Sequence, residues 1–227
     1  MDTPRAQFTA PLPARMKRLA VDHRGFPVPW FVQWMVDGKP VDYGQGAPDF
    51  RVMDSRKLGR AVREKRCWVC GERLGVHLAF VIGPMCAINR VISEPPSHRE
   101  CAEFSAKACP FLSRPRMRRN EKDLPSDHRE APGFGLKRNP GVACLWFTRS
   151  FRTFRAQVGN AGILFRLGEP EAVEWYANGR PATRNEVMAS IDSGLPSLRE
   201  PAEQEGPDAV KALEAAIAKA MPLLPAA

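Results

Sequence analysis

The stretch CWVCGERLG, residues 67–75, decides how the centre of this chain folds. Cys67 and Cys70 have two residues between them, and Gly71 follows directly. In a zinc knuckle, two thiolates lie at a tight turn whose backbone N–H groups point at sulfur. The glycine allows the positive φ with which the chain leaves that turn. The stretch therefore predicts one half of a tetrahedral metal site.

The second half is predicted by SHRECAEFSAKAC, residues 97–109, which follows two prolines. Ser97 is a good N-cap, and the run after it is typical of a helix. Side chains at positions i and i+3 of a first helical turn lie on one face, so His98 and Cys101 can meet at one ion. We expect a structural Zn2+ held by Cys67, Cys70, His98 and Cys101.

Other roles for the cysteines must be weighed against this one. If His98 is only a polar residue at the helix start, Cys86 or Cys109 completes an all-cysteine site. A redox C-x-x-C pair belongs to a βαβ pattern, which does not surround residues 67–70. Five cysteines in residues 67–112 also allow an iron–sulfur cluster, but their spacings match no ferredoxin pattern. Cys144, in an apolar strand pattern, is expected to be an inert core residue.

The order of knuckle, hairpin-like stretch (residues 74–85) and ligands on a helix's first turn resembles the treble-clef zinc fingers. This resemblance covers residues 67–112 and implies a Zn2+ that stabilises the module by about ten kcal/mol at neutral pH. The stretch GPMCAINRVISEPPSHRECAEFSAKACPFLSRP, with CWVCG before it and GEPEAVEWYANGRPATRNEV after it, is similar to uncharacterised proteins of bacteriophages and prophages. That similarity implies an origin, and with it the cytoplasm of a bacterial host, but no mechanism.

The HNH nucleases are also treble clefs, and they imply an alternative function. The resemblance makes His77 a general base and Asn89 its companion, ahead of a helix that bears a metal-binding histidine. Val76 stands where those enzymes carry an acid or a histidine, and His98 cannot bind a catalytic metal if it holds the structural zinc. The H-x-E of a zinc deaminase, residues 98–100, has no C-x-x-C after it.

The charge of the chain favours an anionic partner. Its net charge is +9, and arginine supplies much of the excess. The rings of RSFRTFR, residues 149–155, can stack on unpaired bases, although an ordinary strand would bury Phe151 and Phe154 and show its arginines to water. We predict a non-enzymatic protein that binds DNA or RNA, with a module that binds a host protein as a further alternative. The candidate phosphate contacts are Arg114, Arg116, Arg118, Arg119, Arg149, Arg152 and Arg155.

The predicted fold class is α+β, with a central zinc module, short strands around it and helices toward the C-terminus. The expected segments are a basic, proline-rich arm (1–25), a small β segment plus helix (26–66), the treble-clef module (67–112), a basic linker or loop (113–141) and an α+β segment with a C-terminal helix (142–227). No apolar run approaches the ~20 residues of a membrane span. The N-terminus lacks a hydrophobic signal segment, so we expect a cytoplasmic protein with no membrane partner.

Local patterns predict individual elements. Strands are expected at residues 30–36, 39–41, 48–54, 142–149, 162–168 and 172–179, with a turn at Asp37-Gly38. Helices are expected at residues 55–66, capped by Ser55, and at 208–221. A further helix follows a capping box of Thr183 and Glu186 and ends before Gly194 as its C′ residue.

Overall fold

The computed structural model describes residues 10–114, 117–118, 120–122, 124, 132, 139–157 and 159–226. The strands are β1 (Val32–Val36), β2 (Lys39–Val41), β3 (Ala47–Met53), β4 (Leu78–Ile82), β5 (Val91–Ile92), β6 (Ala143–Thr148), β7 (Phe151–Arg155), β8 (Ile163–Leu167), β9 (Ala172–Ala177) and β10 (Arg180–Pro181). The helices are α1 (Ser55–Arg63), α2 (Pro84–Asn89), α3 (Arg99–Ala108), α4 (Pro110–Ser113), α5 (Arg184–Gly194), α6 (Pro196–Glu205) and α7 (Pro207–Ala220), with 3-10 turns η1 (Ala14–Arg18) and η2 (Met221–Leu223). Helices and antiparallel sheets together give the expected α+β class.

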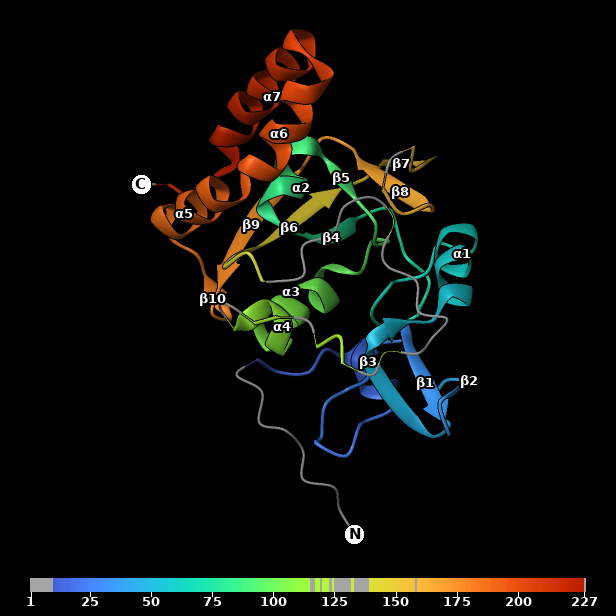
Figure 1. Cartoon of the computed structure of the whole chain (residues 1–227). Helices are drawn as coiled ribbons and strands as arrows, with labels where there is room; N and C mark the ends of the chain where they lie inside the picture. The colour runs from blue at the N-terminus through green and yellow to red at the C-terminus, as the bar shows by residue number, and fades with distance from the viewer. Residues whose placement is uncertain are drawn as a thin grey trace.

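A four-stranded antiparallel sheet, in the order β10-β9-β6-β4, forms the centre of the molecule. Every residue of β6 is buried, because helices cover both faces of the sheet (Figure 1). Successive side chains of a strand point to opposite faces. Cys144 and Trp146 accordingly lie in the main core with α2, α5 and α7, whereas Leu145 and Phe147 pack with residues of α3.

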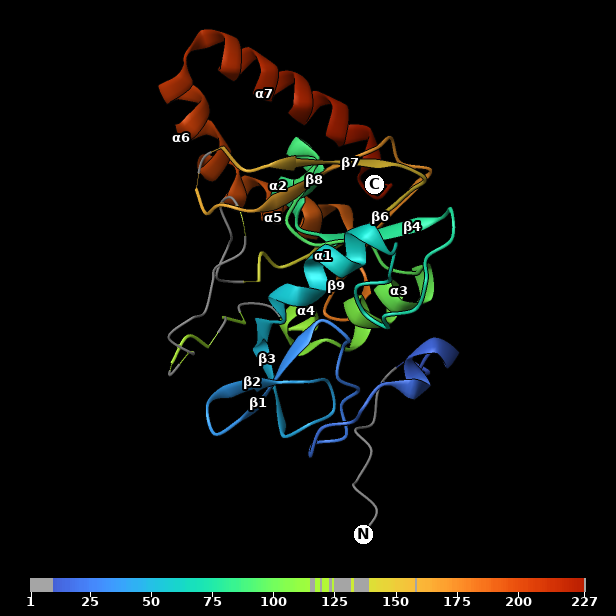
Figure 2. The ribbon, with the colours of Figure 1, turned by 90° about the vertical axis from the view of Figure 1, so that its right-hand side faces the viewer.

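A second sheet, in the order β5-β8-β7, lies against the same core. Phe151 of β7 meets Phe80 of β4 at 5.7 Å between ring centroids and Phe165 of β8 at 5.6 Å. Figure 2 shows β7 and β8 side by side, on the side of the molecule away from the N-terminal sheet. The core therefore extends from the central sheet to the inner face of β7 and β8.

The N-terminal sheet, in the order β2-β1-β3, is a hairpin with a third strand. Its turn at Asp37-Gly38 has positive φ at both residues, 49° and 74°, as the sequence predicts for a type I′ hairpin. The residues just before β1 join the sheet to the knuckle. The ring of Phe31 stacks on Trp68 at 4.9 Å, and the N–H of Trp30 donates to the carbonyl of Val69 at 2.7 Å.

The segment expected to be a basic arm is packed where the structure describes it. Met16 of η1 and Leu19 are buried beside Cys67, Cys101 and Phe104. On the outside, the Arg15 side chain is ion-paired to Glu72 at 2.7 Å and to Glu100 at 2.8 Å. The chain from Ala10 to Leu19 therefore packs against the segment that carries the candidate ligands.

Helix ends follow the predictions in part. The capping box of Thr183 and Glu186 is present at the start of α5. The cap of α1 is Asp54, whose side chain accepts from the N–H of Arg56, so Ser55 is the first helical residue instead of the cap. Gly194 is wrong as a C′ residue, because it stays helical and α6 follows; a Cβ there would lie 2.9 Å from the Met85 side chain.

The hairpin expected at residues 74–85 is replaced by one strand and the start of a helix. β4 pairs with β6, which comes from a distant part of the sequence, and α2 begins at Pro84. A single antiparallel bridge between Ala79 and Ser97 is the local pairing of β4. Of the helices in the described residues, none combines the length and the apolar character that crossing a bilayer requires.

Candidate metal centre

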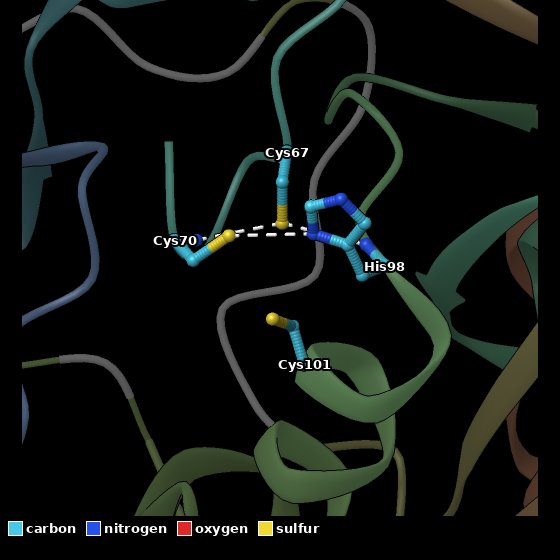
Figure 3. A group of neighbouring side chains, drawn as sticks. All are labelled: Cys67, Cys70, His98 and Cys101. Carbon is cyan, nitrogen blue, oxygen red and sulfur yellow. Dashed lines mark hydrogen bonds between the residues drawn. The ribbon is translucent and has the colours of Figure 1, made fainter. Parts of the chain in front are cut away.

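Four side chains converge between the knuckle and the start of α3. They are Cys67, Cys70, His98 and Cys101, and one ligand atom from each lies within 4.8 Å of all the others. All four are buried, and Figure 3 shows them pointing at a common centre. A tetrahedral zinc ion has Zn–S bonds of about 2.3 Å and Zn–N bonds of about 2.0 Å, which place its ligands roughly 3.5–3.8 Å apart. The group can therefore hold a metal ion of that kind.

The knuckle has the backbone that its sequence predicts. Gly71 has a φ of 76°, and its N–H donates to the carbonyl of Cys67 at 2.9 Å. The sulfur of Cys67 receives backbone N–H groups from Cys70 and from His98, both at 3.4 Å. A Cβ on Gly71 would lie 2.6 Å from the ring of Trp30, so glycine is required for space as well as for φ.

His98 is held in one orientation by contacts on both sides of its ring. Its Nδ1 lies 3.3 Å from the sulfur of Cys70, and its Nε2 lies 3.1 Å from the carbonyl oxygen of Arg73. Donation from Nε2–H to that carbonyl leaves Nδ1 as the free ligand atom, the usual arrangement of metal-binding histidines. The Arg73 carbonyl helps to orient the His98 ring, and a motif of side chains could not predict this backbone contact.

The start of α3 is shifted by one residue from the expectation. His98 is the N-cap, with extended backbone angles, and the helix begins at Arg99. Ser97, the expected cap, exchanges two backbone hydrogen bonds with Ala79 of β4, at 2.7 and 2.9 Å. This bridge ties His98 to the central sheet, while Cys101 stands on the first turn of the helix.

The electrostatics of the group favour a cation among the sulfurs. Burial opposes ionisation of Cys67, but hydrogen bonds from Cys101, Cys70 and His98 outweigh it and lower the pKa of this thiol far below its usual range. Hydrogen bonds to Cys67 and Cys70 raise the pKa of His98 to about 10. Protons and metal ions compete for such ligands, so a bound divalent cation would displace the protons that the group otherwise retains.

The remaining cysteines lie outside this group. Cys86 is on α2 beside the main core, and burial raises its pKa to about 11. Cys109 caps the end of α3, and Cys144 is fully buried in β6; burial raises the pKa of both thiols. The structure therefore gathers His98, and neither Cys86 nor Cys109, with the other three ligands.

His77 and Asn89, the candidates for nuclease chemistry, have separate partners. The Nδ1 of His77 lies 3.2 Å from a carboxylate oxygen of Glu171, which is also paired with Arg149 at 2.5 Å. The side chain of Asn89 accepts from the N–H of Val91 at the end of α2. The contact between Glu171 and His77 could not be predicted from sequence, because Glu171 lies just before β9, far along the chain from His77. Within the described residues, the four-residue group is the one cluster of three or more possible metal ligands.

The candidate phosphate contacts differ in their surroundings. Arg116 and Arg119 lie outside the described residues, and Arg114 and Arg118 are exposed. Arg152 and Arg155 are exposed on β7, and no described acidic residue forms an ion pair with either. Of the two rings on β7, Phe151 packs against the core as in an ordinary strand, while Phe154 is exposed.

Comparison of the chain with protein-family models, with curated proteins and with solved structures finds no match.

Proposed function

We propose that this protein holds a structural Zn2+ between its knuckle and α3, and that its basic surface binds nucleic acid. The donor set carries the first half of the proposal. Three thiol sulfurs and one imidazole suit zinc, whereas Mg2+ and Ca2+ prefer oxygen ligands. Four protein donors fill a tetrahedral ion and leave no position for water, which is the pattern of structural sites.

The position of the group explains what the ion would stabilise. The knuckle carries the N-terminal sheet through Trp30 and Phe31, and α3 packs on the central sheet through Ala102 and Ala106. An ion shared by the knuckle and α3 would fasten these two parts together. We include in the proposal that the module is of treble-clef type, with the second strand of its hairpin reduced to the bridge at Ser97.

The nucleic-acid half rests on unpaired cations. The chain has a net charge of +9, and Arg152 and Arg155 stand on an exposed strand with no acidic partner among the described residues. Arginine binds phosphate through paired hydrogen bonds, as it binds carboxylate. An origin in a bacteriophage, and action inside a bacterial host, belong to this proposal on the sequence resemblance alone.

Native mass spectrometry and elemental analysis of protein purified from cells test both halves. We expect one zinc per chain and retained nucleic acid that high salt removes. Iron with acid-labile sulfide, or a folded protein without metal, would refute the zinc proposal. Affinity for DNA and RNA that is absent at low salt would refute the nucleic-acid proposal.

A nuclease is the second candidate, because Glu171 gives His77 the carboxylate that the sequence did not offer. Both side chains are exposed, and hydrolysis also needs a metal ion with an open position near the base. We therefore expect no cleavage of plasmid or single-stranded DNA with Mg2+, Mn2+ or Ni2+, and unchanged affinity in His77→Ala. Metal-dependent nicking that His77→Ala abolishes, with zinc content intact, would establish the nuclease instead.

A further inference from the structure

The outer face of the sheet β5-β8-β7 carries two arginines in direct opposition. Arg152 of β7 pairs in register with Arg166 of β8, so their side chains leave the sheet on the same face. Like charges directly opposite one another destabilise a sheet. No described acidic residue forms an ion pair with either arginine. A bound anion between the two guanidinium groups would remove this repulsion.

An aromatic ring stands next to the arginine pair. Phe154 is two residues after Arg152 and pairs with Leu164, so it shares the outer face. Its side chain is 36% exposed, and the guanidinium of Arg166 lies 5.4 Å from the ring centroid. β7 is at the edge of its sheet, so its far side pairs with no other described strand.

A cavity continues the cationic surface at the end of β8. It has a volume of about 310 Å³, and Arg166 lines it together with Arg90 and Lys219. Arg90 and Lys219 share a single carboxylate, that of Glu169, at 2.5 and 3.1 Å. Three cations near one acid leave a net positive charge here, which would attract a second phosphate beside the arginine pair.

We propose that this face binds single-stranded nucleic acid, with Phe154 stacked on a base and Arg152 and Arg166 on the neighbouring phosphate. The inference rests on the proposed function and names its substrate class. A ring can stack only on a base whose face is free, and a duplex keeps its base faces covered by one another. A polyanion without bases would engage the arginines but gain nothing from the ring. The face thus combines a charge for the backbone with a platform for the base.

The test measures fluorescence anisotropy of the zinc-loaded full-length protein with labelled dT20, U20 and a 20-base-pair duplex, and competition by heparin. Phe154→Ala should weaken binding to the single strands by roughly 5- to 150-fold, the range of one lost base–aromatic stack. Phe50→Ala is the matched control, because Phe50 is 39% exposed and also lies 5.4 Å below an arginine, Arg24. It should leave affinity unchanged.

Variants that remove positive charges measure the contribution of the arginines to binding separately from that of the Phe154 ring. The double variant Arg152→Ala/Arg166→Ala should lower the slope of log affinity against log salt by at least about 0.7, the value of one phosphate on a single strand. Arg199→Ala/Lys211→Ala removes two exposed cations from α6 and α7 and should leave the slope unchanged.

The outcomes distinguish this inference from the function on which it rests. Weaker binding of dT20 and U20 by Phe154→Ala, with duplex and heparin binding unaffected, supports both. Wild-type protein that binds no nucleic acid refutes both. Two results would refute the single-strand face but leave the proposed function standing. In the first, wild-type protein binds nucleic acid and Phe154→Ala binds the single strands equally tightly. In the second, wild-type protein binds the duplex more tightly than the single strands. A dependence on dT20 alone or U20 alone identifies DNA or RNA as the ligand.

Discussion

Replacing Cys101 with serine should remove the metal and the order that depends on it. Cys101 is fully buried on the first turn of α3, where its sulfur joins those of Cys67 and Cys70. A structural zinc contributes about ten kcal/mol or more at neutral pH, and a whole domain is stable by only about 5–15 kcal/mol. The loss therefore exceeds what the packing around the knuckle can replace, and we expect residues 67–112 to lose protection from hydrogen exchange.

The matched control is Cys144→Ser, which places the same hydroxyl at a fully buried cysteine that is not a ligand. Burial of an unpartnered hydroxyl costs about 1–3 kcal/mol, so this variant should keep one zinc per chain and unfold at slightly lower urea. EDTA should shift wild type and Cys144→Ser to lower urea but leave Cys101→Ser unchanged. A Cys101→Ser protein with one zinc and the stability of Cys144→Ser would refute the assignment of Cys101 as a ligand.

Three further predictions concern the surroundings of the centre. Gly71→Ala should cost at least about 1–2 kcal/mol and weaken zinc retention in a chelator competition, because φ is 76° and the neighbouring tryptophan ring occupies the Cβ position. Asp54→Asn keeps the cap of α1 but leaves the buried ammonium of Lys57, 3.5 Å away, without its counter-charge. Urea denaturation should show that the free energy of unfolding falls by about 3–5 kcal/mol. An unchanged free energy of unfolding would contradict a stabilising ion pair between Asp54 and Lys57. Zinc affinity should rise with pH, because the pKa of His98 is raised to about 10 and a proton must leave Nδ1 before zinc binds below that pH. Each unit of acidification should lower the zinc affinity roughly tenfold through this proton alone. An affinity that does not change with pH would show that His98 is not a ligand.

The grouping of the four candidate metal ligands could be predicted from sequence because the spacing within each pair is local. Each ligand pair lies within one turn of chain, and only the meeting of the two pairs depends on the fold. The same locality explains why the turn at Asp37-Gly38 and the box of Thr183 and Glu186 were predicted correctly. Where two neighbouring polar residues can both cap a helix, the sequence alone does not show which of them is the N-cap. Asp54 caps α1 instead of Ser55, and its carboxylate also pairs with two cations, the exposed Arg56 and the buried Lys57.

The errors have a common physical cause, which is long-range contact. Gly194 looks like a helix stop, but it stays helical, and its lack of a side chain makes space for Met85 of α2. The expected hairpin after the knuckle fails because β4 finds a better partner in β6. Residues around Met16 have the proline and charge content of a linker, but distant residues such as Val69, Cys101 and Phe104 give them an apolar surface to pack against. Glu171 meets His77 across 94 positions of sequence.

The proposed zinc site and the proposed nucleic-acid face rest on different hydrophobic clusters, which differ in size. The cluster under the knuckle holds few buried apolar side chains besides cysteines, namely Met16, Leu19, Val69 and Phe104, so it buries too little area to be stable alone. The main core is larger and includes Phe165 and Leu167 of β8, which support the arginine face from beneath. α3 links the two, because Cys101 and Phe104 point to the knuckle while Ala102 and Ala106 point to the central sheet. An ion at Cys101 would thus hold the N-terminal sheet to the molecule, and Arg152 and Arg166 would keep their geometry through packing that does not involve the ion.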